Sequence, residues 1–182
     1  MKKAIIITHS GFQDHEVIYP YHSLKENNFD VVVVANQLGR FYGILGCHMV
    51  GDVLTTEFES KETRKKYLDY DLLVIPGGVK ALEKLRLEKG VVEFVKQWNA
   101  LDKTIFSLCN GAQLLITADA IKGMGFETFG NNYDNQDNFI GLAGADAGMY
   151  TPPTGSELIT KYVAINNGQI INYWDPGYSF AD

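Results

Sequence analysis

Short runs of apolar residues alternate with more polar segments along the first two thirds of the chain. Each run is apolar at nearly every position and rich in β-branched residues, which is typical of parallel strands buried on both faces. We therefore predict buried strands at residues 4–8, 31–35, 72–75 and 104–108.

The segments between these runs carry helical patterns. Residues 15–27 and 82–101 place apolar side chains on one helical face, and Gly90 is where the second pattern can be interrupted. Strands that alternate with helices indicate βαβ units. The sequence thus predicts an α/β fold, a three-layer αβα sandwich around a mostly parallel, flavodoxin-like sheet. The glycine-rich residues 40–55 alternate partly and predict a small hairpin or extra strands.

The last third of the chain has a different character. Residues 130–155 are rich in Gly, Asn, Asp and Pro with little periodicity, so we expect a long loop region near the site. Residues 161–166 and 169–174 flank Asn167 and Gly168, a pair that favours a two-residue hairpin turn. Since neither an internal repeat nor a linker is visible, we interpret residues 1–182 as a single domain.

Charge and composition narrow the class of protein. A formal net charge of −6 argues against nucleic acid as a main partner, because phosphate binding needs basic patches. We interpret the longest basic run, residues 64–66, as a solvated helix face. No run reaches the roughly 18 apolar residues of a membrane helix, and residues 4–7 are too short for a signal peptide. We expect a soluble cytoplasmic protein with no membrane contact, no cofactor and no metal.

The chain contains two cysteines, Cys47 and Cys109, which fit no CxxC spacing. In a core-rich chain we interpret them as free cytosolic thiols, and a disulfide between them is left open. Cys109 follows the predicted strand 104–108 and precedes a helical pattern at 113–118. Open α/β sheets bind ligands at that edge, and a helix N-terminus stabilises a thiolate and lowers its pKa.

Cys109 is therefore a candidate nucleophile on an elbow between a strand and a helix. Gly111 allows the close packing that such an elbow needs, although Ser107 replaces the first glycine of the G-x-S-x-G pattern. The alternative is a buried structural thiol, because free cysteine is among the most buried residue types.

Other chemistry-bearing residues are predicted at the same edge of the sheet. Gly77 and Gly78 follow the strand at 72–75, and their backbone N–H groups together with that of Asn110 would form an oxyanion hole. The alternative for the glycines is a plain turn between a strand and a helix. Glu16 lies at the start of the first helix, where its carboxyl group would point into the crevice, although an isolated acidic residue there usually pairs with the helix dipole.

All four histidines precede residue 50, so no histidine base follows Cys109 as in the order of α/β-hydrolases. His9 and His15 lie near the end of the first strand and are the two candidates for a supporting role. A single histidine at such a place is more often structural than catalytic.

These motifs together resemble the DJ-1/PfpI superfamily, with its class I glutamine amidotransferase-like fold, and most closely the PfpI-like branch. The resembling stretches follow the family's order and spacing over about residues 3–120. They are residues 11–16 (GFQDHE), 19–26 (YPYHSLKE), 73–78 (LVIPGG), 85–87 (LRL) and 107–115 (SLCNGAQLL).

The resemblance implies a role for each matching residue. Cys109 matches the elbow cysteine, Glu16 the glutamate beside its sulfur, and Gly77 and Gly78 the backbone donors. Glu83 matches a glutamate that reaches the site of a neighbouring subunit. Family members form homodimers, often assembled further, and their activities include peptidase, glyoxalase or deglycase chemistry, isonitrile hydration, and chaperone or redox-sensing roles.

One departure from the PfpI branch changes the expected chemistry. The family has histidine directly after the cysteine, and here that residue is Asn110. Asparagine cannot take up a proton at neutral pH, although it can form hydrogen bonds. The missing dyad counts against an intracellular peptidase.

Our leading hypothesis is a hydro-lyase or hydrolase that acts on an electrophilic carbon of a small molecule. Cys109 would be the nucleophile and Glu16 the acid and base, as in an isonitrile hydratase or a glyoxalase or deglycase, with His15 as possible support. Burial in the crevice would raise the pKa of Glu16. The alternatives are a redox or stress sensor that oxidises Cys109 without turnover, and a relative that keeps only its assembly.

Overall fold

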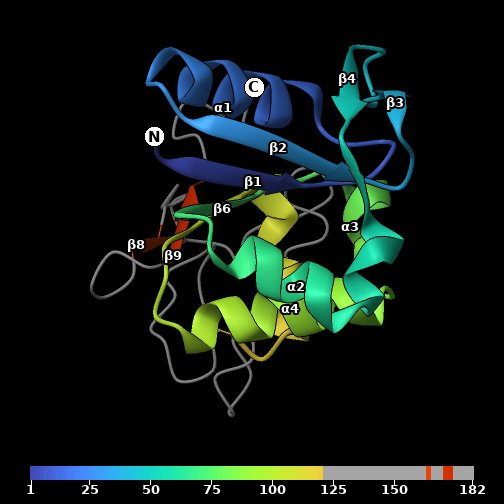
Figure 1. Ribbon diagram of the computed structural model, residues 1–182. Helices are drawn as coiled ribbons and strands as arrows, with labels where there is room; N and C mark the ends of the chain where they lie inside the picture. Colours follow the sequence, from blue (N-terminus) through green and yellow to red (C-terminus); the bar gives the residue numbers. More distant parts are fainter. Residues whose placement is uncertain (121–162, 165–169, 174–182) are drawn as a thin grey trace, which may run out of the picture.

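A computed structural model describes residues 1–120, 163–164 and 170–173, and a mostly parallel sheet runs through this part (Figure 1). Its strands lie in the order β5-β2-β1-β6-β7-β9-β8. Neighbouring strands in this order are parallel except β8 and β9, which are antiparallel. The strand bounds are β1 (Lys3–Ile7), β2 (Asp30–Ala35), β5 (Val53–Leu54), β6 (Leu72–Ile75), β7 (Ile105–Leu108), β8 (Val163–Ala164) and β9 (Ile170–Tyr173).

The central strands form because their side chains are apolar on both faces. Ile5, Ile6 and Ile7 of β1 are fully buried, as are Leu73 and Val74 of β6. Each side chain of this size contributes about 1.5–3 kcal/mol on full burial, so the strands are fixed where the apolar runs lie. The four predicted strands are confirmed to within one residue at each end.

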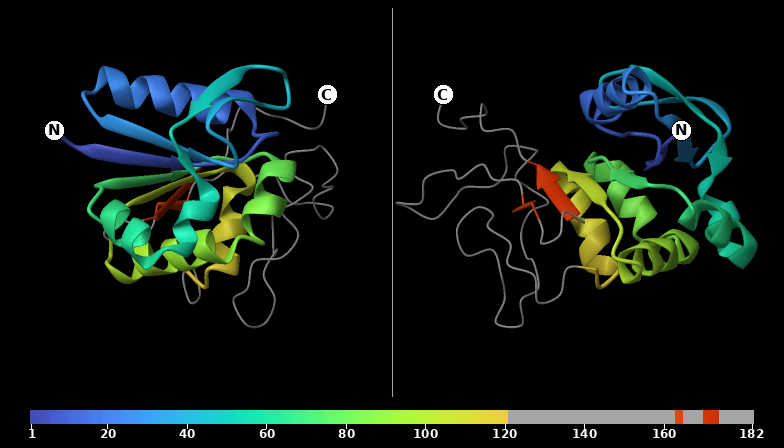
Figure 2. Two further views of the ribbon diagram at one scale, coloured as in Figure 1. Left: turned by 45° about the vertical axis from the view of Figure 1, so that its right-hand side comes forward. Right: turned by 60° about the vertical axis from the view of Figure 1, so that its left-hand side comes forward.

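Helices cover both faces of this sheet, which confirms the predicted α/β sandwich. Figure 1 shows α1 on one side of β1 and β2, and α2 and α4 on the other side; the left view of Figure 2 agrees. On the second side α4 packs against α2, α5 and the 3₁₀ turn η1. Within the described ranges, no helix has the length and apolar character that crossing a membrane requires. The bounds are α1 (Asp14–Glu26), η1 (Thr55–Glu59), α2 (Lys61–Leu68), α3 (Val79–Leu85), α4 (Lys89–Ala100), η2 (Cys109–Gly111) and α5 (Ala112–Thr117).

The prediction of one helix over residues 82–101 is wrong. The chain forms α3 and then α4, with a break at residues 86–88 that precedes Gly90. Gly90 lies inside α4 and lets it approach η1, because a Cβ there would stand less than 3.0 Å from backbone atoms of Phe58 and Glu59. The apolar period continues across the break because both helices bury one face, so periodicity alone does not reveal it.

The interpretation of residues 64–66 as a solvated face is wrong for the first of them. Arg64 is only 8% exposed, and its Nη1 donates hydrogen bonds to the carbonyl oxygens of Phe58 and Glu59. The two lysines that follow it are exposed. Arg64 therefore ties α2 to the 3₁₀ turn η1, because its guanidinium reaches the carbonyl groups at the end of that turn.

Both predicted hairpin regions contain antiparallel strands. Residues 40–55 supply β3 (Gly39–Tyr42) and β4 (His48–Gly51), which pair with each other, and then β5. The pairing of β8 with β9 agrees with the predicted second hairpin. The residues between β8 and β9, and the predicted loop at 130–155, lie outside the described residues.

Candidate active site

Cys109 stands at the sharp turn where β7 ends and η2 and α5 follow. Its φ angle is +50°, in the left-handed region that residues other than glycine rarely adopt. A Cβ at Gly111 would stand less than 3.0 Å from the carbonyl oxygen of Ile75 and from Ser107 Oγ. The predicted elbow is therefore present: a buried strand leads into a strained cysteine, and a glycine allows the turn to pack against β6.

Gly77 is the point at which three chemistry-bearing segments meet. It follows β6, which pairs in parallel with β7, so the carboxyl ends of the two strands lie side by side. A Cβ at position 77 would stand less than 3.0 Å from Glu16 Oε2, Asn110 Oδ1 and Cys109 Cβ. These three side chains share one small space, and only a glycine fits between them.

Glu16 is brought to this space by the first turn of α1. Its Oε2 accepts a 2.7 Å hydrogen bond from the backbone N–H of Gly77. The start of α1 is fixed to the end of β6 because the N–H of Gln13 donates to the carbonyl oxygen of Gly77 at 3.3 Å. The carboxyl group predicted to point into the crevice is only 12% exposed and lies at the cysteine elbow.

The backbone N–H of Gly78 is already engaged by a side chain. It donates a buried 2.8 Å hydrogen bond to Asn110 Oδ1. The φ angle of Gly78 is +110°, a conformation that glycine adopts without strain. The sequence predicted that the backbone N–H of Asn110 is a donor and that its side chain can form hydrogen bonds, but it did not predict Gly78 as the partner of that side chain. The signal was an amide residue beside a Gly-Gly turn, but the pairing becomes visible only once β6 and β7 are neighbours.

Comparison with known proteins agrees with this geometry. A model of the DJ-1/PfpI family matches residues 2–131. The chain belongs to the DJ-1/PfpI family. Over 121 residues it is 35% identical to a deglycase of Pyrococcus abyssi and 36% identical to a deglycase of Thermococcus kodakarensis, in each case over 66% of this chain and 68% of the relative. A solved two-domain protein of Anabaena variabilis with DJ-1/ThiJ/PfpI-like and ferritin-like domains is also similar, with a TM-score of 0.67 and 27% identity over 97% of this chain and 44% of that one.

The region that matches the DJ-1/PfpI family contains every residue gathered around Gly77. The two residues predicted to give support lie further out. His15 has a side chain that is 69% exposed, and its Nε2 is 4.0 Å from Glu16 Oε1. Glu83 is exposed on α3, and its role toward a neighbouring subunit stays a prediction.

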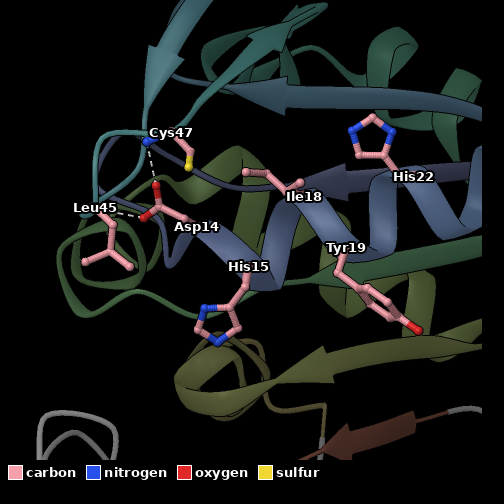
Figure 3. A pocket seen from close by; sticks show the side chains of 7 residues that line it. All are labelled: Asp14, His15, Ile18, Tyr19, His22, Leu45 and Cys47. Carbon is pink, nitrogen blue, oxygen red and sulfur yellow. Dashed lines mark hydrogen bonds between the residues drawn. The ribbon is translucent and has the colours of Figure 1, made fainter.

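A groove of about 450 Å³ lies along α1 in this DJ-1/PfpI chain, and its lining does not include Cys109 (Figure 3). Asp14 is buried beside it and accepts hydrogen bonds from the backbone N–H groups of Leu45 and Cys47, at 2.8 and 2.7 Å. The Asp14 carboxylate also accepts a hydrogen bond from the thiol, which raises the pKa of Cys47. The groove is lined by Asp14, His15, Ile18, Tyr19, His22, Leu45 and Cys47.

The two cysteines of this family member are not joined by a disulfide, and they differ in burial. Cys47 is exposed and Cys109 is buried. The remaining histidine candidate, His9, is 8% exposed at the end of β1, with Nδ1 at 3.3 Å from the carbonyl oxygen of Ser10. Burial lowers the pKa of His9. His9 is thus a buried imidazole that favours its neutral form.

Proposed function

We propose that this chain is a glyoxalase-like or deglycase-like enzyme that acts on small dicarbonyl compounds, with Cys109 as nucleophile and Glu16 as acid and base. The observation that carries the proposal is the meeting of Cys109, Glu16 and Asn110 around Gly77. A thiol, a carboxyl group and a neutral amide in one space can perform addition to a carbonyl group without a histidine. The relatives named as deglycases in Pyrococcus abyssi and Thermococcus kodakarensis support the deglycase-like reaction class.

In the first step Cys109 Sγ attacks the aldehyde carbon of an α-dicarbonyl compound. A C–S bond forms, and the π electron pair of the C=O bond moves to its oxygen. The Glu16 carboxylate takes the proton of the thiol and delivers it to that oxygen. The product is a neutral thiohemiacetal, and Glu16 is a carboxylate again.

In the second step Glu16 is the base of a rearrangement. It removes the proton from the carbon that bears sulfur, which gives an enediolate and a protonated Glu16. Glu16 then returns this proton to the neighbouring carbon that was the ketone, while the hydroxyl proton on the sulfur-bearing carbon moves to the former ketone oxygen and leaves a C=O group. The resulting thioester is hydrolysed by water, so a 2-hydroxy acid leaves and Cys109 regains its thiol. The sum of these steps is a dicarbonyl compound plus water giving a hydroxy acid.

Asn110 separates this chemistry from peptide hydrolysis. In a Cys-His dyad the histidine gives the proton to the leaving amine, and the amide of Asn110 cannot do so at neutral pH. A neutral hydrogen-bonding residue after Cys109 is also compatible with isonitrile hydration, which is the second candidate. Both reactions need the same nucleophile and the same carboxyl group.

Turnover of methylglyoxal by the purified protein, followed as loss of dicarbonyl and appearance of lactate, tests the proposal. We expect Cys109→Ala to abolish turnover and Cys47→Ala, the matched thiol control, to leave it unchanged. Glu16→Gln keeps an oxygen for the Gly77 N–H but cannot move a proton, so kcat should fall by about 10²–10⁴-fold. Full turnover by Cys109→Ala would reject the proposal.

The same proteins distinguish the other candidates. Hydration of an isonitrile to the formamide, lost in Cys109→Ala, would replace the dicarbonyl reaction with the second candidate. If neither compound is turned over, and mild peroxide adds two oxygens to the peptide that contains Cys109, the sensor hypothesis is favoured instead.

We also propose that copies of this chain associate as a homodimer or a higher homo-oligomer. The exposed apolar residues Tyr19, Ile44 and Leu45 on α1 and the loop between β3 and β4 support this face as the contact. Sedimentation analysis of the wild type and of Leu45→Glu tests it. We expect a dimer or larger species that Leu45→Glu weakens, and a monomeric wild type would contradict the proposal.

A further inference from the structure

The side chain of Asn110 is held in one orientation. The backbone N–H of Gly78 can only donate, so the side-chain atom that faces it at 2.8 Å is the acceptor Oδ1. The amide nitrogen Nδ2 is therefore directed away from Gly78. This assignment follows from the hydrogen bond and does not depend on the similar shapes of the two ends of an amide.

Nδ2 of Asn110 is a buried donor without an acceptor among the residues that the structure describes. The whole residue is only 1% exposed. A buried N–H group that lacks an acceptor is unfavourable, and native proteins rarely keep one without a reason such as catalysis. An acceptor that arrives with a bound molecule satisfies this donor.

The unsatisfied donor lies beside the reactive cysteine. Asn110 follows Cys109 directly, and Asn110 Oδ1 and Cys109 Cβ both stand less than 3.0 Å from the place a Cβ would take at Gly77. Nδ2 is bonded to the same carbon as Oδ1 and lies about 2 Å from it. For Nδ2 to act on a bound substrate, an oxygen on a carbon bonded to Cys109 Sγ must come within hydrogen-bond distance of it.

We propose that Asn110 is a catalytic residue whose Nδ2 binds the developing anion on the substrate, in place of the backbone N–H of Gly78. The inference rests on the proposed addition at Cys109 and names its oxyanion donor. As the C–S bond forms, the π pair of the C=O bond moves to oxygen, and Nδ2 holds this charge until Glu16 delivers the proton. Nδ2 keeps its own hydrogens throughout, and Gly78 fixes the amide through Oδ1.

This assignment selects among electrophiles. Addition of a thiolate to an aldehyde or ketone places negative charge on an oxygen next to the attacked carbon, where Nδ2 can donate to it. Addition to an isonitrile creates no such oxygen. Asn110 therefore favours carbonyl substrates over isonitriles at the same cysteine.

Two variants, made with Cys47→Ala so that Cys109 is the remaining thiol, test the inference with methylglyoxal. Asn110→Asp keeps an oxygen over the Gly78 N–H and removes the donor, so kcat should fall by about 10²–10³-fold with little change in KM. The loss should shrink as the pH falls, because a protonated carboxyl group donates a hydrogen bond again. Asn110→Ala removes the donor but uncovers the Gly78 N–H, so its loss should be smaller.

Alkylation of Cys109 by iodoacetamide is the control for structural damage, because displacement of iodide creates no oxyanion. We expect Asn110→Ala to be alkylated at about the rate of the parent protein while its kcat is lower. If alkylation falls in parallel with kcat, Asn110 has a structural role and the inference is overturned. If Asn110→Ala turns over as fast as the parent or faster, the Gly78 N–H is the donor, and the inference is overturned as well.

A measurement without turnover separates this inference from the proposed function. Acetaldehyde adds to a thiol but has no second carbonyl group to rearrange, so it protects Cys109 from iodoacetamide reversibly. Protection should be about two- to tenfold weaker in Asn110→Ala, which corresponds to one hydrogen bond. If the parent is protected but does not turn over methylglyoxal, the proposed function fails, and this comparison alone decides the role of Asn110. Equal protection of the parent and Asn110→Ala overturns the inference.

Discussion

The backbone N–H of Gly77 donates a 2.7 Å hydrogen bond to Glu16 Oε2 across 61 positions of the sequence. The bond gives the carboxyl group a fixed orientation at the cysteine elbow. It is available because position 77 has no side chain, since a Cβ there would press on both Glu16 and Cys109. The site therefore requires glycine at position 77.

Gly77→Ala should disturb the site more than the fold. The added Cβ cannot avoid Glu16 Oε2, Asn110 Oδ1 and Cys109 Cβ, so we expect turnover to fall at least about 100-fold, because small misplacements of reacting groups have this effect. The free energy of unfolding should drop by about 1–3 kcal/mol, which is typical of overpacking. Kinetics with methylglyoxal and urea denaturation measure the two effects.

Gly46→Ala is the control for this glycine. Gly46 has a φ of +93°, and no atom of the described residues lies within 4 Å of the place where its Cβ would be. Its replacement therefore tests backbone strain alone, which costs about 1–2 kcal/mol, and turnover should be unchanged. Equal activity of Gly77→Ala and Gly46→Ala would contradict the arrangement around Gly77.

Cys47 should react slowly with alkylating reagents although it is exposed. Its thiol donates to the Asp14 carboxylate, and this hydrogen bond raises the pKa of Cys47, so less thiolate is present at neutral pH. Asp14→Asn removes the negative charge, lowers the pKa and should speed alkylation. Peptide mass spectrometry after timed exposure to iodoacetamide, with Cys109→Ala to leave one thiol, measures the rate. A slower reaction in Asp14→Asn would show that the carboxylate does not hold the proton.

Arg64 should contribute more to the free energy of unfolding than residues of a solvated charged run usually do. Its guanidinium is buried and bonds the carbonyl oxygens of Phe58 and Glu59. Arg64→Ala leaves these groups without their donor and opens a space, so we expect a loss of about 2–4 kcal/mol in the free energy of unfolding. Lys65→Ala, the exposed neighbour on the same helix, should change it by less than about 0.5 kcal/mol. Equal effects in urea denaturation would argue against the buried role of Arg64.

The free energy of unfolding should decrease in mild acid because His9 becomes protonated. Burial lowers the pKa of His9 in the folded protein, so the unfolded chain binds a proton more readily than the folded one. The stabilisation that comes from keeping His9 neutral is therefore complete above the pKa of His9 in the unfolded chain, about 6.5. It is lost as the pH falls through the lower pKa that His9 has in the folded protein. His9→Asn should make the free energy of unfolding less dependent on pH below about 6.5, whereas the exposed His22→Gln should not. An identical pH dependence in wild type and His9→Asn would remove His9 as the cause.

The strands and the elbow could be predicted because each depends on local sequence. Buried parallel strands are apolar on both faces, and the apolar, β-branched runs at 72–75 and 104–108 fit this pattern. Cys109 directly follows such a run, so its place at the sheet edge came from the same pattern. The place of Glu16 at the start of the first helix predicted that its carboxyl group points into the same crevice, but its position directly beside the cysteine could be predicted only through the resemblance to the DJ-1/PfpI superfamily.

The remaining contacts depend on distances that a sequence does not contain. The burial of Arg64 requires the end of η1 to lie beside α2, and a charged run is ordinarily solvated. The hydrogen bond from Gly78 to Asn110 spans 32 positions and exists only because β6 and β7 pair in register. The break between α3 and α4 was missed because both helices bury the same kind of face.

The distances along the chain between the site's partners also bear on how the protein folds. Glu16, Gly77 and Asn110 come from segments that meet only when β6 has paired with β1 on one side and β7 on the other. Strands that lie so far apart in sequence pair slowly, because the entropy cost of closing a long loop is met before the pairing contributes any favourable free energy. During synthesis Cys109 therefore emerges as an ordinary thiol, and it acquires its surroundings only once β6 has paired with β1 and β7. The rate at which Cys109 is alkylated therefore indicates whether these strands have paired. Pulse labelling with iodoacetamide during refolding can follow this change in time.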